Sequence, residues 1–173
     1  MTSLVETHAV AAAVAGLARP GDLVVLSGEM GAGKTAFAQG FGLALGVSEP
    51  ITSPTFTLVH SYELPRYAAA ETLHHADLYR LDRTTEVADL ALNELAEDDG
   101  IVLVEWGDVA DTLFGDHLDV HLETVVDEVD DVDDEALLSG EGATSRLIEL
   151  SASGSSWAGR WSRLVEACED FAC

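Results

Sequence analysis

Two short runs of consecutive apolar residues stand out along this chain, LVVLS at 23–27 and IVLVEW at 101–106. Such runs are typical of strands that a parallel sheet buries on both faces. A helix-spaced pattern follows the first run, because Phe37 and Phe41 recur within KTAFAQGFGLALG and Gly46 is placed as a cap. The pattern predicts a buried strand that leads through a glycine-rich loop into an amphipathic helix.

Weaker patterns cover the rest of the chain. Ser3 and Glu6 resemble a capping box and ARPG is a stop signal, so a first helix is expected to end near Arg19. TFTLVHSYEL and ETLHHADLYRL indicate neighbouring strands joined by a hairpin or a long loop, and TTEVADLALNELAEDDG indicates one or two short helices. HLDVHLETV and TSRLIELSA alternate as edge strands with one wet face do, and SWAGRWSRLVEACEDFA predicts a closing helix.

Length and charge narrow the function classes. The 173 residues are 47% hydrophobic and are expected to form one domain, 1–173, with the acidic stretch 127–141 as a solvated loop. Eight basic residues against 32 acidic ones give a net charge of -24, which repels phosphate backbones and argues against direct, non-specific binding of nucleic acid. The apolar AVAAAVAGLA is too short to span a bilayer, so no membrane association and a cytoplasmic location are expected.

Cys168 and Cys173 lack the spacing of a zinc site.

Lys34 is the only lysine of the chain, and it lies in a phosphate-binding pattern. Gly28, Gly33, Lys34 and Thr35 fit G-x-x-x-x-G-K-[ST] between the first buried strand and its helix. In such a loop backbone N–H groups surround the phosphates, the lysine reaches the outer ones and the hydroxyl binds Mg²⁺. The sequence therefore predicts a P-loop α/β fold with a mixed sheet flanked by helices. The residues expected at the nucleotide are Gly28, Gly31, Ala32, Gly33, Lys34, Thr35 and Ala36.

Acidic residues at strand ends complete the expected site. Glu105 ends the second apolar run, where a carboxylate can bind Mg²⁺ directly or through water. Asp77 could bind the metal or position water, although its spacing alone does not distinguish it. ATP is favoured over GTP as the cofactor, because an Asn-Lys-x-Asp motif would need a second lysine.

Two other function classes remain open at this point. A P-loop kinase for a small molecule would need an arginine-rich lid, for which Arg66, Arg80 and Arg83 are candidates, yet they are scattered. A nucleotide-gated binding module with negligible turnover would need only the P-loop. A screen for phosphorylated acceptors distinguishes the first class, and pull-downs with and without turnover distinguish the second.

Four motifs together, SGEMGAGKT, ITSPTFTLVHSY, LHHADLYRL and VLVEWGD, make the chain similar to the bacterial TsaE (YjeE) family. That family is the P-loop ATPase component of the machinery that makes threonylcarbamoyladenosine in tRNA. The resemblance is close from residue 2 to residue 122 and looser beyond. It implies an ATPase that works with a TsaD-like catalytic subunit and a TsaB-like subunit, with tRNA contacted only indirectly. Because no arginine is marked by its position as the group that neutralises transition-state charge, hydrolysis is expected to be weak alone and stimulated by these partners.

The resemblance also implies roles for single residues. Lys34, Asp77 and Glu105 would be catalytic, and Thr35, Glu105 and Asp77 would serve the metal. Thr55 would lie in a nucleotide-sensing loop like the switch of small GTPases. Trp106 would be either a ring at the nucleotide or a core ring at a strand end. Ala36 departs from the family pattern, which commonly has a second hydroxyl residue there.

Overall fold

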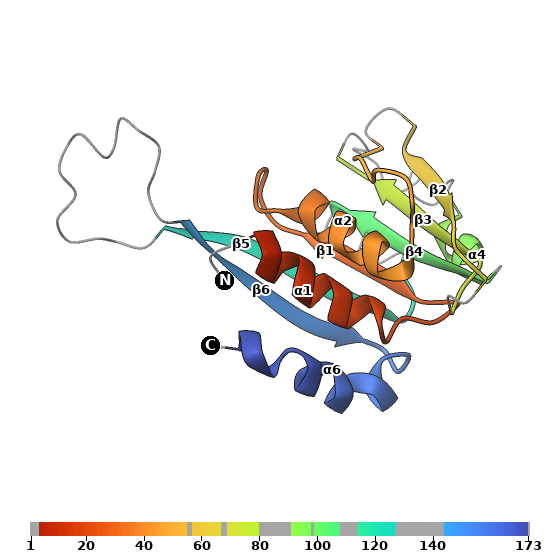
Figure 1. The fold of residues 1–173 in the computed structure, drawn as a ribbon. Coiled ribbons are helices and arrows are strands. Elements are labelled where there is room, and N and C mark those ends of the chain that lie inside the picture. Colours follow the sequence, from red (N-terminus) through yellow and green to blue (C-terminus); the bar gives the residue numbers. More distant parts are fainter. Residues whose placement is uncertain are drawn as a thin grey trace, which may run out of the picture.

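The computed structural model describes residues 4–54, 57–66, 69–79, 91–97, 99–107, 114–126 and 144–172. Within these ranges six strands form one sheet in the order β2-β3-β4-β1-β5-β6 (Figure 1). The strands are β1 (Leu23–Ser27), β2 (Val59–Glu63), β3 (Thr72–Asp77), β4 (Gly100–Glu105), β5 (His117–Val126) and β6 (Thr144–Ser153). The helices are α1 (Leu4–Ala15), α2 (Lys34–Leu45), α4 (Leu92–Glu97) and α6 (Trp161–Ala167), with 3-10 turns η3 (Ala158–Arg160) and η4 (Glu169–Phe171).

The sheet mixes parallel and antiparallel pairing. β1 is parallel to β4 and to β5, and β3 is parallel to β4. β2 and β6 run antiparallel to their neighbours at the two edges. β2 and β3 are the neighbouring strands that the sequence predicts, and they pair antiparallel. The two apolar runs are the central strands, and the side chains of 23–26 and 101–104 are at most 2% exposed. The α/β fold with a mixed sheet and flanking helices is confirmed.

The position of β5 corrects the sequence-based prediction, which placed both alternating segments at sheet edges. β6 is an edge strand, but β5 lies between β1 and β6 and pairs with both. The alternation reports only which face is buried, with Leu118, Val120 and Leu122 in the core. It carries no information about a neighbouring strand, which is why an interior strand resembles an edge strand in the sequence.

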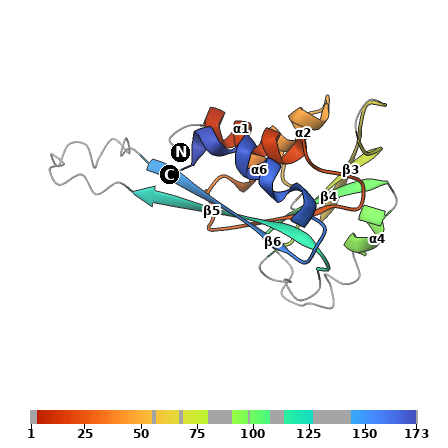
Figure 2. The ribbon, with the colours of Figure 1, turned by 90° about the horizontal axis from the view of Figure 1, so that it is seen from below.

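Helices cover the two faces of the sheet unequally (Figure 2). α1, α2 and α6 lie over one face, and the small helix α4 lies over the other. Phe37 and Phe41 of α2 are fully buried in the larger core cluster, with ring centroids 6.5 Å apart. Leu92 and Ala96 of α4 close a smaller cluster on the opposite face. α2 and the loop before it therefore lie on the face of the sheet that α1 and α6 also cover.

Several helix ends differ from the sequence-based expectation. α1 ends at Ala15, before the predicted Arg19, because the chain tightens into i→i+3 hydrogen bonds from Leu17 N to Val14 O and from Ala18 N to Ala15 O. The predicted closing helix is divided into η3, α6 and η4. The cap of α2 is as predicted, since Gly46 has a left-handed φ of 92°.

Several predictions concern residues outside the described ranges and stay predictions. These residues are Ser3, Thr55, Arg80, Arg83, the acidic stretch 127–141 and Cys173. Within the described ranges, no helix has the length and apolar character needed to cross a membrane.

A buried ion pair joins the C-terminal segment to the turn before β1. Arg160 and Asp22 are each 4% exposed, and Arg160 Nη2 donates to Asp22 Oδ1 at 2.7 Å. Arg160 also donates to the carbonyl oxygens of Leu17 and Ser156, at 2.8 Å and 2.7 Å. The guanidinium carbon lies 4.1 Å from the ring centroid of Trp157. These contacts hold η3 and the start of α6 against the α1–β1 connection.

Replacing Asp22 by asparagine is expected to lower the free energy of unfolding by about 3 kcal/mol, because the variant leaves the Arg160 charge buried without its counter-charge. Urea denaturation followed by circular dichroism measures the change. Arg163→Gln, at an exposed position of α6, is the control and should shift stability by less than about 0.5 kcal/mol. A denaturation curve of Asp22→Asn that overlays the wild type would contradict the structural role of the pair.

Candidate nucleotide-binding site

The loop from β1 to α2 has the geometry of a phosphate-binding loop. Gly28 has a φ of 125°, and a Cβ built there would lie 2.0 Å from the carbonyl oxygen of Leu122, so only glycine fits. α2 begins at Lys34 with Gly33 as its N-cap, without a side-chain cap and without an acidic residue in its first turn. The first N–H groups of α2 thus lack the side-chain acceptor that usually satisfies a helix start. This arrangement favours an anion at the start of α2.

The side chain of Lys34 bends back over the loop that precedes it. Its Nζ donates to the carbonyl oxygens of Gly28 at 2.7 Å and Glu29 at 2.8 Å, and the residue is 4% exposed. The Nζ also lies 3.5 Å from the ring centroid of Trp106, within cation–π range. The ammonium group is therefore positioned at the mouth of the loop.

Glu105 connects the start of α2 to β3. The hydroxyl Oγ1 of Thr35 donates to Glu105 Oε2 at 3.1 Å, and His75 Nε2 donates to Oε1 at 3.0 Å. Glu105 is 2% exposed and His75 is fully buried. Because both carboxylate oxygens accept a hydrogen bond, the Glu105 side chain is held in one orientation.

Asp77 lies beside Glu105, because β3 and β4 are parallel and pair these two residues in register. Its Oδ2 accepts a short hydrogen bond from Ser53 Oγ, and its Oδ1 accepts one from Tyr79 N at 3.0 Å. Ser53 belongs to the segment that leads toward Thr55, so the carboxylate is linked to the start of that segment. The two acids expected from the sequence lie at neighbouring strand ends.

Trp106 follows β4 at the edge of the site. Its φ is 64°, and its N–H donates to Leu26 O of β1 at 2.9 Å. Its ring is partly buried and lies 4.9 Å from the ring of Tyr79, measured between centroids. The ring packs partly against the smaller core cluster and also borders the cleft, so its contact with a nucleotide stays a prediction.

A cleft of about 360 Å³ joins these groups at the carboxyl ends of β1, β3 and β4. Its lining residues are Met30, Gly31, Gly33, Lys34, Thr35, Ala36, Ser53, Asp77, Tyr79, Glu105 and Trp106. Most of the site residues expected from the sequence therefore meet in one place. Ala32 differs, because its side chain packs in the larger core cluster and its N–H donates to Glu29 O at 3.2 Å. Gly28 borders the adjoining hollow on the β5 side, and Thr55 lies outside the described residues.

Sequence reasoning missed four residues of this site: Met30, Ser53 and Tyr79, which line the cleft, and His75, which contacts Glu105. His75 stands two positions before Asp77 on β3, and residues so spaced on a strand share one face. That alternation was a usable signal for His75. Ser53 gave no such signal, because its contact with Asp77 depends on how the chain returns between α2 and β2.

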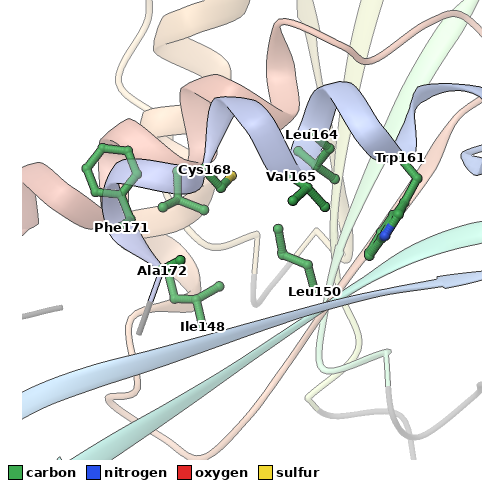
Figure 3. A pocket seen from close by; sticks show the side chains of 9 residues that line it. Ile148, Leu150, Trp161, Leu164, Val165, Cys168, Phe171 and Ala172 are labelled. Atoms are coloured by element: carbon green, nitrogen blue, oxygen red, sulfur yellow. The ribbon is translucent and has the colours of Figure 1, made fainter.

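An apolar groove between β6 and α6 is a second hollow of the molecule (Figure 3). Ile148 and Leu150 of β6 face Trp161, Val165 and Cys168 across it. Burial raises the pKa of the Cys168 thiol, which lowers its reactivity at neutral pH. The groove offers no cluster of charged groups, in contrast to the cleft at the P-loop.

Comparisons with known proteins place this chain in a family. The family model "TsaE: Threonylcarbamoyl adenosine biosynthesis protein TsaE" matches residues 1–132. The TsaE protein of Bacillus subtilis is 42% identical over 104 residues, which are 58% of this chain and 60% of that protein. The TsaE protein of Mycobacterium tuberculosis H37Rv is 46% identical over 112 residues, 61% of this chain and 66% of its own length. The chain thus matches less than two thirds of the length of these relatives.

A solved structure extends the likeness beyond the matched segment. The crystal structure of Bacillus subtilis YdiB superposes with a TM-score of 0.65 and 28% sequence identity, and it covers 99% of this chain and 92% of that one. The family match spans more than half of the residues, from the first helix through the P-loop and β4. The chain therefore belongs to the TsaE family of threonylcarbamoyl adenosine biosynthesis proteins.

Proposed function

We propose that this protein binds ATP with Mg²⁺ and hydrolyses it as the nucleotide-dependent component of the machinery that makes threonylcarbamoyladenosine in tRNA. Its partners in this proposal are a TsaD-like catalytic subunit and a TsaB-like subunit. The supporting observation is the convergence of Lys34, Thr35 and Glu105 in one cleft. Family membership supplies the pathway, since the names of the relatives tie them to threonylcarbamoyladenosine biosynthesis.

The residues present fit a nucleoside triphosphate. The start of α2 has no side-chain cap and no first-turn acid, so its N–H groups are suited to phosphate oxygens. Lys34, which is the only lysine of the chain, adds a positive charge at the same place. In a protein with a net charge of -24, local cations and N–H groups are needed to hold a polyanion against the overall repulsion.

The residues present also fit Mg²⁺, provided that phosphate and water oxygens complete the coordination. Thr35 and Glu105 offer oxygen ligands 3.1 Å apart. Among the described residues, no group of three or more histidine, cysteine, aspartate or glutamate side chains could hold a metal alone. A P-loop magnesium site needs no such group, because it uses few protein ligands. When bound, the ion would neutralise charge on the outer phosphates during transfer to water.

Asp77 and His75 act on this site in different ways in our proposal. Asp77 lies next to Glu105 at the strand ends, where a carboxylate can orient the attacking water or a water that binds the metal. His75 is buried behind Glu105 and reaches it through Nε2, so it positions Glu105 and does not touch the nucleotide.

Of the three candidate lid arginines of a small-molecule kinase, the part of the chain that the structure describes holds Arg66 alone, and its position does not support this alternative. Arg66, one candidate for a lid, borders a hollow formed with Glu63, Thr72 and Asp99. Thr72 begins β3 and Asp77 ends it, so this hollow lies at the opposite end of the strand from the cleft. Arg66 is therefore far from the proposed phosphates.

We expect the isolated protein to bind ATP well, to hydrolyse it slowly, and to be stimulated by the TsaB–TsaD-like pair. The reason is that a partner can supply the group that neutralises the developing charge, as happens in other P-loop proteins. The strongly acidic chain also leaves tRNA binding to its partners. The measurement is ATP hydrolysis and threonylcarbamoyladenosine formation with all components, then without this chain, and then with Lys34→Ala.

Multiple-turnover modification of tRNA should stop in the second and third reactions. Equal product in all three reactions would contradict the proposed role. Fast hydrolysis by the chain alone would contradict the need for partner activation. Tight ATP binding without hydrolysis, even with both partners, would instead identify a nucleotide-gated binding module.

A further inference from the structure

Ser53 and Asp77 meet at the wall of the cleft, although 24 positions separate them in the sequence. Ser53 Oγ donates to Asp77 Oδ2, and the N–H of Tyr79 donates to Oδ1 at 3.0 Å. Both Ser53 and Asp77 line the cleft, and Asp77 is 4% exposed. Because each carboxylate oxygen accepts a hydrogen bond, rotation of the carboxylate group is restricted. The Asp77 carboxylate is therefore presented to the cleft in one orientation.

The connection between α2 and β2 holds Ser53 from both sides. Two positions before it, Ile51 is 5% exposed, and its carbonyl oxygen accepts a hydrogen bond from Gln39 Nε2 of α2 at 3.1 Å. Directly after it, Pro54 is buried, and a residue that precedes proline is largely restricted to extended backbone. These contacts do not involve the Asp77 carboxylate. The backbone thus places the Ser53 hydroxyl as a donor toward that group.

Orientation matters for the role that we assign to Asp77. A carboxylate that orients water must present a lone pair along one direction, because a hydrogen bond weakens steeply as its angle departs from linear. Glu105, at the paired position of β4, has its two oxygens held by the side chains of Thr35 and His75. Ser53 is a side-chain donor that does the same for one oxygen of Asp77.

We propose that Ser53 is a positioning residue for hydrolysis, whose hydroxyl holds the Asp77 carboxylate in the orientation that directs water; this inference rests on the proposed function. In that function the phosphates are held by Lys34 and by the N–H groups at the start of α2. Ser53 therefore contributes to the rate of hydrolysis and not to the binding of ATP. Without its hydroxyl the carboxylate can rotate, so the effect of Ser53 requires the carboxylate of Asp77.

The test is single-turnover hydrolysis by Ser53→Ala with both partner subunits, together with its affinity for ATP and Mg²⁺ by calorimetry. The rate should fall by about 10-fold, as for the loss of one hydrogen bond to a charged group, while the dissociation constant stays within about 2-fold of the wild type. Ser53→Thr keeps the hydroxyl and should restore most of the rate. Ser151→Ala, which removes the hydroxyl of an exposed serine of β6, is the control and should change neither quantity.

A double variant shows whether Ser53 acts through Asp77. In an Asp77→Asn protein the amide cannot replace the carboxylate in any orientation, so Ser53→Ala should cause no further loss of rate. A further loss of about 10-fold in the double variant would overturn the inference, because independent effects multiply. An unchanged rate in Ser53→Ala would overturn it too, as would full hydrolysis in Asp77→Asn alone, which leaves Ser53 nothing to position. Weaker ATP binding that matches the loss of rate would show direct contact with the nucleotide and also contradict it.

Failure of the proposed function gives a different result. A wild-type protein that binds no ATP, or that hydrolyses none with both partners, removes the function itself. The outcomes for Ser53 are read in a protein that does both. Thermal unfolding of each variant verifies that folded proteins are compared. If the alanine variant does not fold, Ser53→Cys provides the comparison, because its thiol has a similar shape but is a weaker donor and should also slow hydrolysis.

Discussion

Replacement of Lys34 by alanine is expected to lower the affinity for magnesium-ATP by about 100-fold or more. The ammonium group is held at the mouth of the P-loop by the carbonyl oxygens of Gly28 and Glu29, at 2.7 Å and 2.8 Å. The chain has no second lysine that could replace it. A triphosphate in the cleft would therefore lose its charge-assisted contact with the loop. Isothermal titration calorimetry with ATP and Mg²⁺ measures the loss directly.

Two further measurements separate this loss from unfolding. The Lys34→Ala variant loses two hydrogen bonds to loop carbonyls, so its thermal midpoint should fall only slightly. The protein then stays folded under the conditions in which its affinity for ATP is measured. Arg163→Ala removes a positive charge from exposed α6 and should leave ATP affinity unchanged. Wild-type affinity in a folded Lys34→Ala protein would show that no phosphate binds at this loop, and the proposed function would fall with it.

The sequence was sufficient to predict the central part of this site, because its signals are local. A run of apolar residues, a glycine-rich loop and a helix-spaced pattern follow one another within 23–45, and the structure has β1, the loop and α2 there. Glu105 directly ends the second apolar run, so its place at the end of a buried strand could also be predicted. Parallel strands put their carboxyl ends at the same sheet edge, which brings Glu105 to the P-loop.

The remaining features of the fold and the site depend on contacts between segments that are distant in the sequence. The pattern of hydrophobic and polar residues does not encode such contacts. β5 resembles an edge strand in the sequence, although β6 pairs with it, and the position of Arg146 beside Gly33 depends on that same pairing. Sequence reasoning found no arginine distinguished by its position, because β6 lies far along the chain from the loop it reaches. His75 was likewise visible only as a neighbour of Asp77, while its hydrogen bond to Glu105 requires the register of β3 against β4.

Glu105 and Asp77 are expected to affect turnover more than binding. Glu105 accepts hydrogen bonds from Thr35 and His75, and both are contacts within the protein. Glutamine has nearly the same volume and keeps an oxygen that can accept from one of them, so Glu105→Gln should remain folded. The same reasoning applies to Asp77→Asn, whose contacts are with Ser53 and the N–H of Tyr79. Neither change removes Lys34 or the N–H groups of α2.

In Glu105→Gln and in Asp77→Asn, affinity for ATP should stay within about 5-fold of the wild type, while partner-stimulated hydrolysis falls by about 100-fold or more. The physical reason is that a neutral amide cannot hold the metal or orient water as a carboxylate does, whereas the phosphates are held mainly by the P-loop. Calorimetry and single-turnover hydrolysis with both partners measure the two quantities separately. Glu149→Gln, an exposed acid of β6, is the control for the loss of one negative charge and should change neither. Full hydrolysis in either site variant would remove that residue from the mechanism. If ATP affinity and hydrolysis fall together in one of these variants, the carboxylate of that residue serves nucleotide binding, contrary to the role assigned to it.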